Sequence, residues 1–129
     1  MALSPDSRER LIQAAVAARK RAYAPYSGYQ VGAALLTIGN TIISGCNVEN
    51  GVYPATICAE RTAVVKAVSD GSQKFIAIAV ATDDGAYPCG ICRQTLYEFA
   101  PDLVVLIADS SGRLIAETPL IICFHTVFG

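Results

Sequence analysis

The sequence lacks any uninterrupted apolar run of the roughly 18 residues that a membrane-spanning helix needs. Glycine, proline or a polar residue breaks each apolar stretch. We therefore expect no membrane partner. The first ten residues are polar and charged, without the apolar centre of a secretory signal, and this favours a cytoplasmic protein.

Clustered positive charge is also scarce. The formal net charge is −1 at pH 7, and the densest basic run is Arg19-Lys20-Arg21. Proteins that bind a long polyanion do so through many lysine and arginine contacts with phosphates. We therefore expect no nucleic-acid partner and favour a small or uncharged ligand.

Repeats, linkers and low-complexity segments are absent as well. The 129 residues are long enough to bury a core without disulfides, so residues 1–129 are predicted to form one domain. Hydrophobic residues make up 53% of the chain, and its mean hydropathy is +0.41. A value this high indicates a heavily buried sheet or apolar surface hidden in an oligomer.

The order of the apolar patterns predicts an α/β fold with a mixed five-stranded sheet and helices on its faces. A tight turn at 109–112 predicts that the last two strands form an antiparallel hairpin. The expected helices are 5–22, 55–70 and 89–99, and the expected strands are 31–38, 41–48, 75–81, 104–108 and 113–117. In such sheets a site forms at strand ends, where neighbouring helices begin.

Three of the five cysteines occur in two short motifs. Cys58 precedes Ala59-Glu60-Arg61, and Pro88 precedes Cys89 and Cys92. Three thiolates suit a tetrahedral Zn²⁺ ion and leave its fourth position open for water, as in catalytic sites. Helix starts also favour thiolate over thiol. The alternative is three buried cysteines without a metal, which the order and spacing of the motifs disfavour.

Glu60 and Arg61 follow the first of these cysteines directly. A carboxylate beside the metal can take a proton from water and deliver it to a substrate, so Glu60 is the candidate catalytic residue. Arg61 carries a charge that would offset the excess negative charge of three thiolates on one Zn²⁺. Without a metal, both side chains would be ordinary surface charges. Asn47 and Glu49, two residues apart at a strand end, face the same way and suit a sugar hydroxyl.

The chain resembles the small cytidine deaminases of pyrimidine salvage, and the resemblance extends over roughly residues 22 to 118. Four separated segments carry it, namely 32–36, 45–50, 58–61 and 88–94. It implies a three-layer α/β/α fold and a homotetramer whose subunits share active sites. It also implies that hydroxide on zinc adds to C4 of cytosine while Glu60 shuttles protons, so that uridine and ammonia leave; deoxycytidine would react likewise.

The resemblance assigns further residues to the substrate. Asn47 and Glu49 match the pair that holds the ribose 3′-hydroxyl, and the backbone of Ala59 would meet the pyrimidine carbonyl. Gly51 and Tyr53 match the segment that a neighbouring subunit offers to the sugar.

The sequence departs from the family pattern at two places. Tyr29 stands where phenylalanine is usual, and its hydroxyl needs a partner. Near the end, His125 replaces a proline, whereas Phe128 aligns with the aromatic residue that reaches a neighbouring site. For His125 a structural or surface role is favoured.

Three other functions remain open. A deaminase of an aminonucleoside antibiotic of the blasticidin S type shares the metal motif, although the residues 47–50 favour an ordinary nucleoside. A deaminase that acts on bases within nucleic acid is disfavoured by the short 109–112 turn and the low positive charge. A non-catalytic, zinc-stabilised binding module would make Glu60 dispensable.

Overall fold

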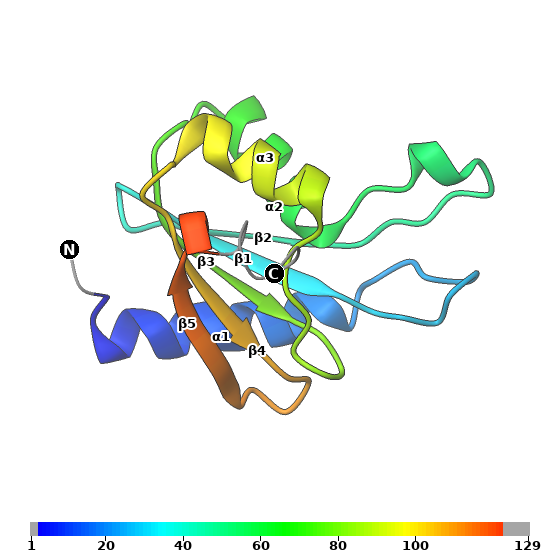
Figure 1. Cartoon of the computed structure of the whole chain (residues 1–129), viewed down its shortest axis with the longest axis horizontal. Helices are drawn as coiled ribbons and strands as arrows, with labels where there is room; N and C mark the ends of the chain where they lie inside the picture. The colour runs from blue at the N-terminus through cyan, green and yellow to red at the C-terminus, as the bar shows by residue number, and fades with distance from the viewer. Residues whose placement is uncertain (1–2, 123–129) are drawn as a thin grey trace.

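The computed structural model describes residues 3–122, and a five-stranded sheet lies at its centre (Figure 1). The helices are α1 (Pro5–Arg19), α2 (Ala59–Ser69) and α3 (Gly90–Phe99), with a short 3-10 helix, η1 (Tyr53–Ala55). The strands are β1 (Gly32–Thr37), β2 (Ile42–Cys46), β3 (Phe75–Ala81), β4 (Val104–Ala108) and β5 (Leu114–Pro119). Helix α1 covers one face of the sheet, and α2 and α3 cover the other.

The strand order is β2-β1-β3-β4-β5. Strands β3 and β4 are parallel and are connected through α3, whereas every other neighbouring pair is antiparallel. This confirms the predicted mixed sheet, the α/β/α layers and the final hairpin. The βαβ unit places the start of α3 at the carboxyl end of β3, which is the edge where α/β folds build their sites.

Several element boundaries were predicted wrongly. The first helix ends at Arg19 and not near 22. The helix expected from about 55 begins only at Ala59, because the segment before it forms η1 and then extended backbone. Cys58 therefore stands at the N-cap position, directly before α2, and does not lie in its first turn. Val48 lies beyond the end of β2, where it makes only isolated bridges with Tyr23 and Ile57.

The high hydropathy is explained largely by the sheet. Every residue of β1 is buried, and so are the last five of β3. One apolar cluster packs between the sheet and the α2–α3 layer, and a second packs between the sheet and α1. Edge strand β5 is mostly exposed or half-buried. Within residues 3–122, every helix is too short or too polar to cross a membrane.

Gly32 marks the closest approach between α1 and the sheet. A Cβ atom at this position would lie 2.0 Å from the carbonyl oxygen of Ala15 and 2.4 Å from the backbone nitrogen of Arg19. Both atoms belong to a helix backbone, which cannot move aside as a flexible side chain can. A larger residue here must therefore push α1 away from β1.

We expect Gly32→Ala to lower the free energy of unfolding by about 3 kcal/mol, near the upper end of typical overpacking penalties. Urea denaturation followed by circular dichroism measures the change. Gly39→Ala is the matched control, because the nearest atom to its added Cβ would be 3.9 Å away. Equal midpoints for Gly32→Ala and the wild type would contradict the close packing.

Candidate metal centre and active site

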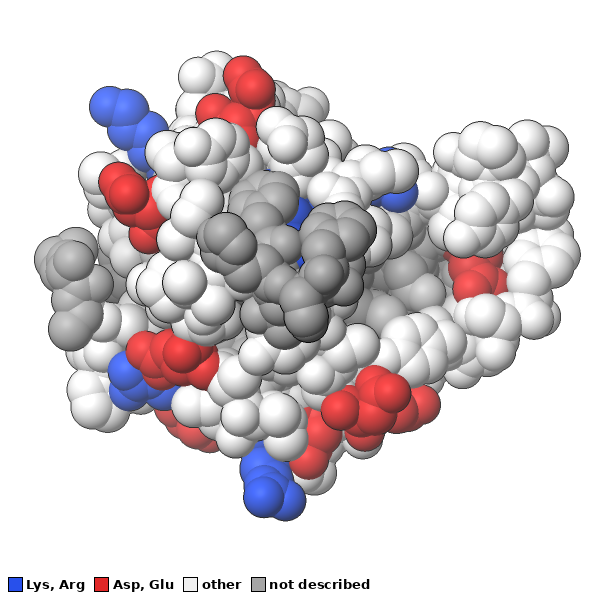
Figure 2. Space-filling model, viewed as in Figure 1, with Lys and Arg blue, Asp and Glu red and all other residues white. Residues whose placement is uncertain are grey.

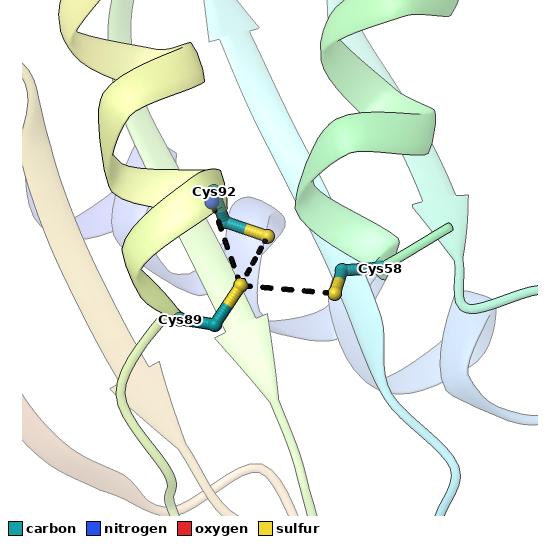
Figure 3. A group of neighbouring side chains, drawn as sticks. All are labelled: Cys58, Cys89 and Cys92. Atoms are coloured by element: carbon teal, nitrogen blue, oxygen red, sulfur yellow. Dashed lines mark hydrogen bonds between the residues drawn. The ribbon is translucent and has the colours of Figure 1, made fainter. Parts of the chain in front are cut away.

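Three cysteine side chains converge between the starts of α2 and α3 (Figure 3). Cys58 occupies the N-cap position of α2, Cys89 occupies that of α3 and accepts a hydrogen bond from the backbone nitrogen of Cys92, and Cys92 lies one turn into α3. The Sγ atoms of Cys58 and Cys89 are 3.9 Å apart, and those of Cys89 and Cys92 are 3.2 Å apart. All three sulfur atoms lie within 4.8 Å of one another, although Cys58 is distant in sequence from the other two.

This arrangement fits a tetrahedral zinc site. Zinc–sulfur bonds of about 2.3 Å place the sulfur atoms of such a site about 3.8 Å apart. The Cys58–Cys89 separation is already close to that value, and the sulfur atoms of Cys89 and Cys92 need to move apart by only about 0.6 Å. Of the remaining cysteine and histidine residues, Cys46 is outside this group, and Cys123 and His125 lie outside the described residues. Three protein donors leave one coordination position for a non-protein ligand.

The surroundings of the cysteines favour the thiolate at Cys58 and the thiol at Cys92. A hydrogen bond with Cys92, together with the nearby Arg61, lowers the pKa of Cys58 to about 5. The same bond with Cys58, together with burial, raises the pKa of Cys92. Arg61 Nη2 lies 3.7 Å from Cys58 Sγ and donates a hydrogen bond of 3.2 Å to the carbonyl oxygen of Thr56. The guanidinium group is thus held beside the sulfur cluster.

Glu60 is an acidic side chain in the wall of the same site. It is the second residue of α2, and only 5% of its surface is exposed. Burial raises the pKa of its carboxyl group to about 7, and the negative charge of Cys58 adds to this effect. A carboxyl group with such a pKa can both accept and release a proton near neutral pH, which is what a proton shuttle requires.

A cavity of about 350 Å³ opens beside Cys58, Cys89 and Glu60, at the low end of the range for small-molecule sites. Of the residues assigned to substrate, Tyr29, Asn47, Glu49, Tyr53 and Ala59 line it. Gly51 does not, and Phe128 lies outside the described residues. Seven further residues that line the cavity were not predicted from the sequence: Ser27, Val31, Thr56, Val80, Thr82, Ala86 and Tyr87. Thr82 could have been predicted, because it directly follows β3 and sites in α/β folds form at the carboxyl ends of strands.

Asn47 and Glu49 both hold the segment that leads into β1. The amide of Asn47 donates to the carbonyl oxygen of Tyr29 over 2.8 Å and accepts from the backbone nitrogen of Val31 over 2.9 Å. The carboxylate of Glu49 accepts from the backbone nitrogen of Tyr26, and the backbone nitrogen and hydroxyl of Ser27. Its hydrogen bonds with Ser27 lower the pKa of Glu49. The two side chains therefore shape the wall of the cavity that they line.

Comparison with known proteins identifies the family. Residues 5–108 match the family model for the cytidine and deoxycytidylate deaminase zinc-binding region. The chain belongs to this family. Zinc is accordingly the metal of the domain, and Cys58, Cys89 and Cys92 form the group, within the described part of the chain, that could hold it.

Relatives within this deaminase family cover most of the chain. The cytidine deaminase of Sporosarcina psychrophila is 54% identical over 93 residues, which are 70% of this chain and 68% of that protein. The cytidine deaminase of Halalkalibacterium halodurans is 47% identical over 110 residues, 83% of each chain. The crystal structure of the cytidine deaminase from Burkholderia pseudomallei superposes with a TM-score of 0.85 at 40% identity, covering 94% of this chain and 96% of that one.

Proposed function

We propose that this protein is a zinc-dependent hydrolase that deaminates cytidine and deoxycytidine, giving uridine and deoxyuridine with release of ammonia. A role in pyrimidine salvage in the cytoplasm is part of this proposal. The observation that carries it is the cavity in which three convergent thiols lie beside the buried carboxyl group of Glu60. The similarity to cytidine deaminases over most of the chain supports the choice of substrate.

The proposed reaction consumes one water molecule and transfers its protons through Glu60. Bound Zn²⁺ supplies Lewis acidity, which lowers the pKa of water toward neutrality. Glu60 accepts a proton as the water oxygen attacks C4 of the pyrimidine, and it delivers a proton to the ring nitrogen N3. It then passes a proton to the departing amino group, so that the C4–N bond breaks and ammonia leaves. Burial, which raises the pKa of Glu60, allows both directions of transfer.

The residues that line the cavity favour an uncharged nucleoside as the substrate. Among the described residues, no lysine or arginine lines it. On the face shown in Figure 2, acidic and basic side chains are interspersed, without a continuous basic surface for nucleic acid. We propose that Asn47 and Glu49 hold the ribose 3′-hydroxyl, that the ring of Tyr29 packs on the ligand, and that the backbone of Ala59 contacts the pyrimidine carbonyl.

We propose further that the active unit is a homotetramer in which Gly51, Tyr53 and Phe128 reach a neighbouring site. Support comes from the segment around η1, where Tyr53 is 85% exposed and Val52 is 66% exposed. Apolar side chains this exposed at a projecting segment suit burial by another subunit. Light scattering should give a mass four times that of the chain; a monomer would contradict the shared sites.

An ultraviolet assay of cytidine conversion tests the proposed function. Purified, zinc-loaded protein is expected to convert cytidine and deoxycytidine, and a zinc chelator should abolish the conversion. Blasticidin S is a third substrate in the same assay. Activity on blasticidin S alone would assign the protein to antibiotic deamination, and no activity on any of the three would contradict the enzyme proposal and favour a zinc-stabilised binding module.

We expect Arg61→Gln to lower kcat for cytidine by about 10- to 100-fold, the usual range for residues that support metal ligands. The substitution removes the guanidinium group that lies beside Cys58 and leaves the charge of three thiolates uncompensated. Steady-state kinetics and zinc content measure the effect. Arg10→Gln, at an exposed position of α1, is the matched control. Unchanged kcat and zinc content in Arg61→Gln would remove the proposed role.

A further inference from the structure

Two segments that contribute residues to the cavity wall are linked by a side-chain hydrogen bond. The hydroxyl of Tyr29, in the segment before β1, donates to Oδ1 of Asp84, in the segment after β3, over 2.7 Å. Partial burial raises the pKa of Tyr29, and the hydrogen bond lowers the pKa of Asp84. At neutral pH the pair is therefore a protonated donor and an ionised acceptor, which is the stronger kind of hydrogen bond.

Asp84 belongs to a turn that is held together by several hydrogen bonds of Thr82. Thr82 is 2% exposed, and its hydroxyl oxygen accepts from the backbone nitrogens of Gly85 and Ala86, each over 2.8 Å. The same hydroxyl donates to Asp84 Oδ1 over 3.3 Å. An ion pair between Asp83 and Arg19 attaches this turn to the end of α1. The turn then continues through Ala86 and Tyr87 to the metal-site residue Cys89.

On the Tyr29 side, the backbone is fixed at two points. Its nitrogen donates to the hydroxyl oxygen of Ser27 over 3.0 Å, and its carbonyl oxygen accepts from Asn47 over 2.8 Å. Ser27 is in turn bound by Glu49. The hydrogen bonds therefore run without interruption around the cavity, in the order Glu49, Ser27, Tyr29, Asp84, Thr82 and Ala86. Every member of this series except Asp84 lines the cavity.

We infer that Asp84 is a positioning residue that acts through Tyr29: it fixes the aromatic wall of the cavity and joins the segment before β1 to the segment that carries Cys89. This inference rests on the proposed function. Asp84 stands behind the wall and does not line the cavity. A wall that is already ordered lets the substrate bind without the entropic cost of ordering it, so the link should act on KM rather than on kcat.

Four variants test the inference in a double-mutant cycle. Tyr29→Phe keeps the ring and removes the donor, Asp84→Ala removes the acceptor, and the double variant Tyr29→Phe/Asp84→Ala removes both. Asp84→Asn keeps an acceptor oxygen without the charge. We expect each of the first two to raise KM for cytidine by about 3- to 10-fold, the value of one ordinary hydrogen bond, with kcat within about twofold. The double variant should be no worse than either single one.

Asp84→Asn is the conservative rescue and should keep KM within about twofold of the wild type, because its amide oxygen still accepts from Tyr29. Tyr23→Phe is the matched control, since Tyr23 is exposed and does not line the cavity. An unchanged KM in Tyr29→Phe, independent effects that multiply in the double variant, or a KM for Asp84→Asn as high as that for Asp84→Ala would each overturn the inference. If the wild type is active on cytidine, these results test the inference alone. If the wild type is inactive, the proposed function fails, and the inference fails with it.

Discussion

Glu60→Gln should lower kcat/KM for cytidine by about 10³- to 10⁴-fold while zinc stays bound, the upper part of the range for general acid–base catalysis. Glutamine has nearly the same shape as glutamate, but it cannot carry a proton between water, the ring nitrogen and the leaving amino group. The side chain is 5% exposed, so bulk water has little access to replace it as the proton carrier. Single-turnover kinetics with cytidine measures the chemical step itself.

The control for this substitution is Glu98→Gln, because Glu98 is an exposed carboxylate of α3. Its kinetics should equal those of the wild type. Zinc content measured by atomic emission must also be equal in Glu60→Gln, the control and the wild type, so that a lost metal is not mistaken for lost proton transfer. If Glu60→Gln retains full activity with bound zinc, Glu60 is not the proton carrier, and the proposed mechanism is wrong.

The layered fold was predictable because two of its central strands, β3 and β4, are apolar along their whole length. The fully apolar segments 75–81 and 104–108 lie in the buried centre of the sheet, where both faces are covered. Turn residues at 39–40 and 109–112 likewise indicated the two hairpins, which the strand pairing confirms. Local sequence was sufficient in these places because burial and turn geometry both act over a few residues.

Helix boundaries near the site were less predictable because they depend on tertiary contacts. Alanine at 55 and 59 suits a helix equally well, and nothing local shows that the backbone stays extended through Cys58. Ile57, directly before Cys58, pairs with Val48, nine positions earlier, and this pairing holds the backbone extended. The extended backbone ends at Cys58, whose sulfur atom lies 3.9 Å from that of Cys89, so the error in the helix start fell at a residue of the metal centre.

The spacing of the site motifs predicted which chemical groups would meet, but not what supports them. Cys89 and Cys92 are one helical turn apart, so their proximity follows from sequence alone. The hydrogen bond between Tyr29 and Asp84 could not be foreseen, because it joins residues 55 positions apart through loops without a periodic pattern. The contact between Arg61 and the carbonyl oxygen of Thr56 spans only five positions, but it requires the extended backbone before α2, which the sequence did not indicate.

Cys92→Ala should weaken zinc binding by more than about 100-fold and remove cytidine deamination with it. Substitutions that only support a metal ligand already cost about 10- to 100-fold, and this one removes a ligand itself. Two thiolates would remain, too few to hold Zn²⁺ in the three-donor arrangement that a catalytic site uses. Zinc affinity, measured by competition with a chromogenic chelator, gives a readout that does not depend on activity.

Cys46→Ala is the matched control, because Cys46 is a half-buried free cysteine of β2 outside the sulfur cluster. It should bind zinc as the wild type does. Chelator-treated wild type should reproduce the inactivity of Cys92→Ala, and added zinc should restore activity to the treated wild type but not to the variant. Wild-type zinc affinity in Cys92→Ala would show that the metal is held elsewhere, and the assignment of the three cysteines as its ligands would fall.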